Sequence, residues 1–214
     1  MKYQSGTTLI SLLIGLLISM LCIIAVLSSY RTIVKTGVES RVAATHDTQL
    51  QTGLATAQMF LQNAGFGLEG TDYSLATPIK VDSKDIKALL WRYKDDNNTT
   101  ICQGLADIES SDGEKRRFVL LENNSTCDAP LNSDKVNWKV QTTLANLEDY
   151  STNLSNPEQV TFEETLTTCT PFGAGVLDNV PHPLITITAQ TSTQQSAGLG
   201  KAEIRVCLLN IVSP

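Results

Sequence analysis

Apolar residues dominate one long stretch near the start of the chain. Over residues 9–27, nineteen positions follow one another without a charge and without a proline. At about 1.5 Å per residue, a helix of this length covers roughly 28 Å, close to the ~30 Å hydrocarbon core of a bilayer. A core helix of a soluble protein is rarely apolar on every face over such a length. The stretch therefore predicts a membrane-spanning helix.

A helical pattern continues beyond this stretch. Apolar side chains recur at spacings of four, three, four and three residues, which places one apolar stripe along a helix face, at Leu50, Leu54, Ala57, Leu61 and Ala64. We expect one nearly continuous helix from about residue 8 to residue 63, on the order of 80 Å long. Its first half spans the membrane, and its second half packs on a C-terminal domain.

Glycines set the expected end and the expected weak points of this helix. Three of them follow the stripe and supply a stop signal, at Gly65, Gly67 and Gly70. Three others lie inside the helix, where we expect it to bend or locally unwind, at Gly15, Gly37 and Gly53.

Beyond Pro78, the first proline of the chain, the periodicity changes from helical to extended. Short β-rich runs alternate with clusters of Asp, Asn, Gly and Ser; the runs are 86–93, 117–122, 136–144, 159–162, 184–191 and 202–211. The last two runs alternate like strands with one buried face, and 192–200 between them fits a hairpin loop. The pattern predicts an α+β fold, in which one long helix packs on a mainly antiparallel β-sheet.

Composition fits a single globular domain behind a membrane helix. The chain has 214 residues and a formal net charge of −6, which gives no sequence-wide attraction to nucleic acid or anionic lipid. About 150 residues follow the helix, which is enough to bury one core. Neither a low-complexity linker nor an internal repeat divides them.

Five cysteines divide between the two regions. Cys22 lies in the apolar stretch and is interpreted as a packing residue. The four others, in the polar remainder, predict two disulfides in an exported domain, for which three connectivities are open. We favour Cys102 with Cys127 and Cys169 with Cys207. The two cysteines of each pair follow one another among the cysteines of the chain, and the residues between them resemble a strand, a turn and a strand. Zinc is the competing interpretation, but no pair has the spacing of a structural site.

A short leader with one charged residue, Lys2, precedes the apolar stretch. A secretory leader is cleaved after its apolar run, whereas here the glycine, Gly6, stands before it. This arrangement resembles the class III signal peptide of type IV pilins and pseudopilins. The resemblance implies that a membrane-embedded prepilin peptidase cuts between Gly6 and Thr7. It also implies that the apolar helix stays on the mature protein.

Two segments narrow the resemblance. Residues 9–17, together with the run Leu-Gln-Asn-Ala-Gly-Phe-Gly at 61–67, resemble the PilW-type minor pilins, in which a similar Ala-Gly-aromatic-x-Gly element closes the helix. The resemblance implies a pilin-like fold divided into a class III leader (1–6), the transmembrane half of the helix (7–30), its exported half (31–64) and a globular antiparallel sheet domain (65–214).

Two positions depart from the family pattern. The first mature residue is usually an apolar, methylatable one and is here Thr7; the fifth is usually Glu and is here Ser11. In the family, that carboxylate pairs with the N-terminal amine of a neighbouring subunit in the filament, at low dielectric. A Ser cannot neutralise an ammonium. Ser11 therefore indicates either a subunit present once or rarely, at the filament tip, or tolerated drift in a low-abundance subunit.

Residue types that carry chemistry are sparse. His46 and His182 have no nucleophile or metal-ligand spacing around them, so we expect neither a catalytic nor a metal site, no cofactor and no enzyme activity. Residues 95–99 offer oxygen ligands but lack the central Gly and terminal Glu of a calcium loop, so a solvated turn is favoured. The basic cluster 115–117 follows acidic residues and is interpreted as part of a turn, without direct nucleic acid binding.

The resemblance implies a function in assembly. We expect a minor pilin that primes a type IV pilus and sits in its tip complex; a minor pseudopilin of a type II secretion system and an adhesin or receptor-binding module at the pilus tip are the alternatives. The expected partners are other minor pilins, the major pilin, prepilin peptidase, the inner-membrane assembly platform and a tip adhesin. The expected location is the bacterial inner membrane, single-pass with a periplasmic C-terminal domain, and then the extracellular pilus.

Overall fold

The computed structural model describes residues 9–70, 73–81, 84–110, 113, 115–123, 127, 130–133, 136–151, 155–170, 180–193 and 199–211. The chain divides into two units, Met1–Ala44 and Thr45–Pro214. A single helix, α1 (Leu9–Leu61), supplies all the described residues of the first unit and the first element of the second. Among the described residues, α1 is the one helix long and apolar enough to cross a membrane. This confirms the prediction from the sequence that the chain has a helix able to cross a membrane.

Glycines inside α1 do not interrupt it. The helix runs unbroken through Gly15, Gly37 and Gly53, so the expected unwinding there is wrong. A glycine inside a helix costs about 1 kcal/mol relative to alanine but keeps its backbone hydrogen bonds, so a long helix accommodates single glycines. Gly53 serves a different purpose, because a Cβ there would lie 3.0 Å from the carbonyl oxygen of Leu144. It lets the helix approach the sheet closely.

The helix ends where the glycines predict, two residues earlier than expected. Gly65 and Gly67 have φ angles of 76° and 71°, which favour glycine. The amide of Gly65 donates to the carbonyl of Arg92 at 2.9 Å, which joins this turn to the strand β2. A Cβ on Gly65 would also lie 2.6 Å from Ile211, so the turn admits no larger residue without movement.

The described residues of the second unit form two antiparallel sheets instead of the single expected one. Sheet A has the order β1-β2-β3-β4-β5, built from β1 (Tyr73–Val81), β2 (Lys84–Lys94), β3 (Thr100–Glu109), β4 (Arg116–Asn123) and β5 (Lys139–Leu147). Sheet B has the order β6-β7-β8, built from β6 (Val160–Thr167), β7 (His182–Gln190) and β8 (Lys201–Cys207). The predicted hairpin between the last two strands is confirmed.

Two strands escaped prediction for identifiable reasons. β1 contains Pro78, and a proline is tolerated there because β1 is an edge strand. β3 contains Gly104 and two buried polar residues, Gln103 and Asp107, which break the apolar alternation. A Cβ on Gly104 would lie 2.6 Å from Leu90 Cδ2, so a larger residue there would require the Leu90 side chain to move.

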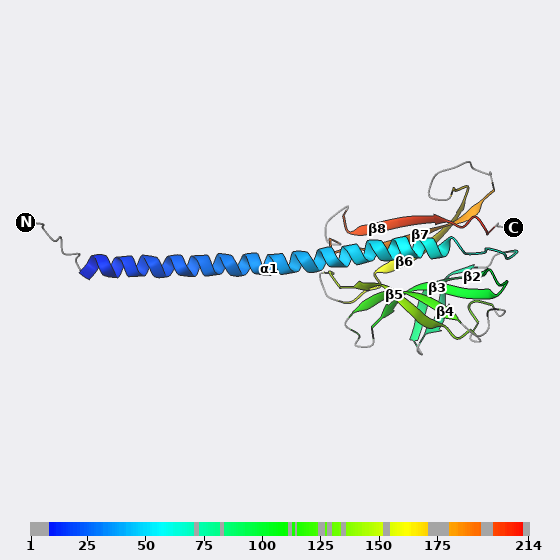
Figure 1. Ribbon diagram of the computed structural model, residues 1–214, viewed down its shortest axis with the longest axis horizontal. Helices are drawn as coiled ribbons and strands as arrows, with labels where there is room; N and C mark the ends of the chain where they lie inside the picture. The colour runs from blue at the N-terminus through cyan, green and yellow to red at the C-terminus, as the bar shows by residue number, and fades with distance from the viewer. Residues whose placement is uncertain are drawn as a thin grey trace, which may run out of the picture. The chain divides into compact units, whose positions relative to one another are not determined.

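Within the second unit, the end of α1 lies between the two sheets (Figure 1). The whole predicted stripe is buried, which confirms that prediction. It packs on Leu89, Trp91, Leu105, Phe118 and Leu120 of sheet A and on Ile185, Ile187 and Val206 of sheet B. Truncating a fully buried leucine of such a cluster costs about 2 to 5 kcal/mol, so this stripe is a main source of the domain's stability.

Sheet A is buried on its other face as well. The connection between β4 and β5 folds over that face and contributes Leu131, Val136 and Trp138 to a second core cluster. Successive residues of β2 and β4 therefore face different cores: Leu89 and Phe118 face the helix, and Leu90 and Val119 face the connection. This explains why the two strands are continuously apolar in the middle instead of alternating.

The antiparallel order places the connections at two ends of the second unit. The Gly65 end holds the close of α1, the β2–β3 turn and the β4–β5 and β6–β7 connections. The His46 end holds the start of the unit's helix, the β3–β4 turn, the β5–β6 connection and the β7–β8 loop. Both names are kept below.

Candidate functional site: the apolar helix and the two ends of the domain

The processing and filament residues predicted from the sequence lie at the start of the chain. Gly6 and Thr7 lie outside the described residues. Ser11 lies in the first turns of α1, on an exposed part of the helix. The most apolar window of α1 has none of its residues buried within the chain, and Leu9, at 77 % exposure, is one of many exposed apolar side chains there. Such a surface is stable only in lipid or against other apolar surfaces.

Exposed apolar residues continue past the bilayer-length stretch. They recur as Tyr30, Ile33, Val34, Val38 and Val42, each at least 45 % exposed. Charged residues are interleaved with them, and Lys35 pairs with Glu39 one turn later at 3.8 Å. This part of α1 therefore combines an apolar stripe with a charged face.

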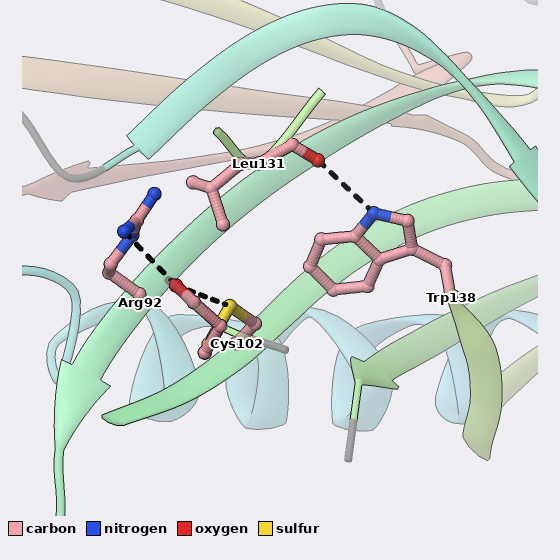
Figure 2. The surroundings of a disulfide bond; sticks show 5 residues. Arg92, Cys102, Leu131 and Trp138 are labelled. Atoms are coloured by element: carbon pink, nitrogen blue, oxygen red, sulfur yellow. Dashed lines mark hydrogen bonds between the residues drawn. A yellow bond between two sulfur atoms is a disulfide. The ribbon is translucent and has the colours of Figure 1, made fainter. Parts of the chain in front are cut away.

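One disulfide lies at the Gly65 end of sheet A. Cys102 in β3 is joined to Cys127 in the β4–β5 connection, with 5.6 Å between their Cα atoms. Arg92 donates to the carbonyl of Cys127 at 3.1 Å, and the indole of Trp138 donates to the carbonyl of Leu131 at 3.2 Å (Figure 2). The disulfide and these hydrogen bonds hold the connection on the outer face of sheet A.

The second disulfide lies at the same end and belongs to sheet B. Cys169 follows β6, and Cys207 closes β8. The pairing is the one favoured from the sequence, and it leaves these four sulfurs unavailable to zinc. Nearby, Asn210 donates to the carbonyl of Gln62 at 3.0 Å, which ties the segment after β8 to the end of α1.

Polar contacts take the place of disulfides at the His46 end. Asp47 accepts hydrogen bonds from the amide and the hydroxyl of Ser192, at 2.8 and 2.6 Å, which joins α1 to the β7–β8 loop. The ring of His46 is buried, lies edge-on to that of Tyr150 and places Nδ1 3.0 Å from Asp47. Burial opposes ionisation of Asp47, but the bonds from Ser192 and His46 outweigh it and lower its pKa.

A buried carboxylate joins the two sheets at the same end. Asp107 in β3 pairs with Arg116 at 2.9 Å and accepts the amides of Gln159 and Val160 at 2.6 and 3.0 Å. Burial raises its pKa, while Arg116 and the two amides partly offset that rise. Sequence reasoning missed this residue. Its one signal is an acidic residue inside the apolar stretch of β3, between Ala106 and Ile108.

The residues considered for chemistry do not come together. His46 and His182 lie at opposite ends of the second unit, and His182 Nδ1 lies 3.0 Å from the carbonyl of Ile211. Asp95 accepts the amides of Asn97 and Thr99, so 95–99 forms a hydrogen-bonded hairpin turn between β2 and β3. No group of three or more His, Cys, Asp or Glu that could hold a metal occurs within the part of the chain that the structure describes.

The basic cluster 115–117 is also dispersed. Lys115 pairs with Glu148 at 2.6 Å, and Arg116 pairs with Asp107. Arg117 is the next residue along β4, so it faces the opposite side of sheet A, at a pocket that Arg116 also lines. The three cations therefore serve separate contacts.

Comparison of the chain with protein-family models, with curated protein sequences and with solved structures finds no match.

Proposed function

We propose that this chain is a minor pilin that helps to prime assembly of a type IV pilus and sits in the complex at its tip. The observation that carries the proposal is Gly6, which stands directly ahead of an uncharged, membrane-length stretch. A peptidase that cuts there leaves the apolar helix on the mature protein, whereas an ordinary signal peptidase removes such a segment.

Features of α1 support the proposal. The part of α1 in the first unit exposes apolar side chains from Leu9 to Val42, a longer stretch than is needed to cross a bilayer. A subunit that leaves the membrane to join a filament needs such a surface twice, first against lipid and then against neighbouring helices. The second part of the helix packs on antiparallel sheets, an arrangement compatible with a pilin-like fold.

Disulfides support export of the domain. Cys102–Cys127 and Cys169–Cys207 persist only in an oxidising compartment such as the periplasm. Since the four cysteines and the membrane stretch belong to one chain, the proposed topology is a single pass with the disulfide-bonded domain outside the inner membrane.

Ser11 supports a subunit used in few copies. A glutamate at this position is useful where another subunit stacks above and offers its amine, and a subunit at the tip has no such neighbour on one side. A serine leaves no unpaired carboxylate in that low-dielectric environment. Tolerated drift in a rare subunit gives the same residue, so copy number is the quantity to measure.

Deletion of the gene tests the proposal. We expect surface pili to fall sharply while the level of major pilin stays unchanged, with partial recovery when retraction is blocked, because fewer filaments are started. Complementation with the unaltered chain should restore piliation, so the Ser11→Glu replacement should not be needed for it. Normal piliation in the deletion strain, or a copy number comparable to that of the major subunit, would contradict the proposal; loss of protein secretion with normal pili would favour the pseudopilin alternative.

A further inference from the structure

A pocket opens on the face of sheet A that points away from α1. It has a volume of about 430 Å³ and is lined by Val81, Lys84, Asp85, Ile86, Ile108, Glu109, Arg116 and Arg117. The β4–β5 connection covers this face with Leu131, Val136 and Trp138, yet none of these three lines the pocket. The pocket thus lies at the His46 end of this face, beside the part that these three side chains cover.

The walls of the pocket are apolar at their base. Val81 and Ile108 are almost fully buried, and Ile86 is partly buried beside them. Ile108 pairs directly with Arg117 across β3 and β4. One guanidinium therefore stands at the side of a small apolar floor formed by three strands.

The cations around the pocket differ in what they contact. Lys84 pairs with Glu109 at 3.0 Å, and Arg116 pairs with Asp107 at 2.9 Å. Arg117 forms no ion pair with any described residue, so among the described cations at this pocket it is the one without a charged partner. A carboxylate ligand would supply that partner through charge-assisted hydrogen bonds.

We propose that this pocket binds a monocarboxylate attached to an apolar group, with Arg117 as the group that binds the carboxylate. Arginine presents a planar fork of donors that matches a carboxylate in two hydrogen bonds. The apolar group would lie against Val81, Ile86 and Ile108. The volume is in the range of small-ligand pockets.

The charges at the rim restrict the ligand to a single negative charge. Asp85 and Glu109 line the same pocket, so phosphates and other multiply charged anions meet repulsion from two carboxylates. Lys84 is already paired with one of them. The same ligand chemistry has two sources, a free organic acid or the carboxyl terminus of a polypeptide that ends in an apolar residue. This inference does not depend on a role in pilus assembly.

Methyl NMR of the full chain in lipid nanodiscs tests the proposal. Isoleucine δ1 methyl groups are labelled, and phenylacetate is titrated against its neutral analogue phenylacetamide. We expect phenylacetate to shift the signals of Ile86 and Ile108 and to leave Ile185 and Ile187, in the core around α1, unchanged. Equal binding of phenylacetamide, or shifts confined to other isoleucines, would overturn the proposal without any variant being needed.

Variants assign the binding group. Arg117→Gln should weaken phenylacetate binding about tenfold or more, in line with the loss of a charge-assisted hydrogen bond. Arg205→Gln is the matched control, since Arg205 is an exposed arginine of sheet B paired with Glu203, and it should bind as the wild type does. Unchanged binding by a folded Arg117→Gln variant would overturn the assignment.

A short peptide that ends in leucine, with a free or an amidated carboxyl terminus, separates the two ligand sources. Binding of the peptide with a free carboxyl terminus, without binding of the amidated peptide, indicates a polypeptide ligand. Binding of phenylacetate without either peptide indicates a small organic acid. Failure of phenylacetate and of both peptides would contradict the proposal.

Discussion

The Gly65 end and the His46 end of the domain hold the same helix by different chemistry. Two disulfides fix the connections at the Gly65 end. At the His46 end, Asp47 and Asp107 hold the helix and the two sheets through hydrogen bonds and an ion pair. Covalent bonds respond to reductant and hardly to pH, whereas carboxylate contacts do the reverse. The two ends can therefore be loosened separately.

Loss of the disulfides should produce the largest effect. We expect paired Cys→Ala replacement of either disulfide to lower the free energy of unfolding by about 2 to 5 kcal/mol. Cys169–Cys207 should cost slightly more, since it spans 38 residues against 25 for Cys102–Cys127. Urea unfolding of the full chain in detergent, followed by tryptophan fluorescence, measures the effect, because Trp91 and Trp138 both lie in the domain cores.

Cys22→Ala is the control for this prediction. Cys22 is exposed on α1 outside the domain, so its replacement should leave the urea midpoint unchanged. Non-reducing peptide mapping of the wild type should recover the two disulfides described. Free thiols at these four positions, or crossed pairs, would contradict the account of the Gly65 end.

The buried carboxylate at the His46 end should give the next largest effect. Asp107→Ala leaves Arg116 and two backbone amides without their acceptor, and we expect a loss of about 3 kcal/mol. Lys115→Ala is the matched control, because the Lys115–Glu148 pair is half exposed at the same end and should contribute only about 0 to 1 kcal/mol. The same urea titration compares them. Equal losses in the two variants would show that Asp107 does not join the sheets.

A smaller, pH-dependent effect is expected at Asp47. Its pKa is lowered in the folded state, so its stabilising contribution is present above the ordinary value of 3.8 and is lost as the pH falls through the folded pKa. Asp47→Asn should therefore cost about 1 to 2 kcal/mol at neutral pH and much less in acid. The measurement compares the urea midpoints of the wild type and of Asp47→Asn, first at neutral pH and then in acid.

Ser192→Ala refines this prediction. It removes the hydroxyl bond from Ser192 to Asp47 and keeps those from the Ser192 amide and from His46, so its cost should be smaller than that of Asp47→Asn. If Asp47→Asn lowers stability equally at both pH values, the contact does not depend on the charge of Asp47.

Local patterns predicted much of this fold. The stripe from Leu50 to Ala64 is a helical repeat, and the favoured disulfides join cysteines adjacent in sequence, so both could be inferred from short segments. The division of strands into two sheets could not, because it depends on which strands pair across long separations. β1 and β3 were missed because a proline and a glycine usually interrupt a strand. Pro78 is tolerated because β1 is at the edge of sheet A, and Gly104 lies where β3 packs closely on Leu90.

Polar contacts between distant segments were beyond sequence reasoning. Asp107 accepts a hydrogen bond from Gln159, which lies 52 residues later in the sequence, and Asp47 accepts from Ser192, which lies 145 residues later. No local spacing connects such pairs. The pocket at Arg117 is hidden for the same reason, since β1, β2, β3 and β4 all contribute to it.

The N-terminus of the mature protein tests the central claim most directly. When the full chain is made in a cell that contains a prepilin peptidase, intact-mass measurement or N-terminal sequencing of the membrane-extracted protein should give a chain that begins at Thr7, with residues 9–27 retained. A chain that still begins at Met1, or one cut after Leu27, would contradict the account.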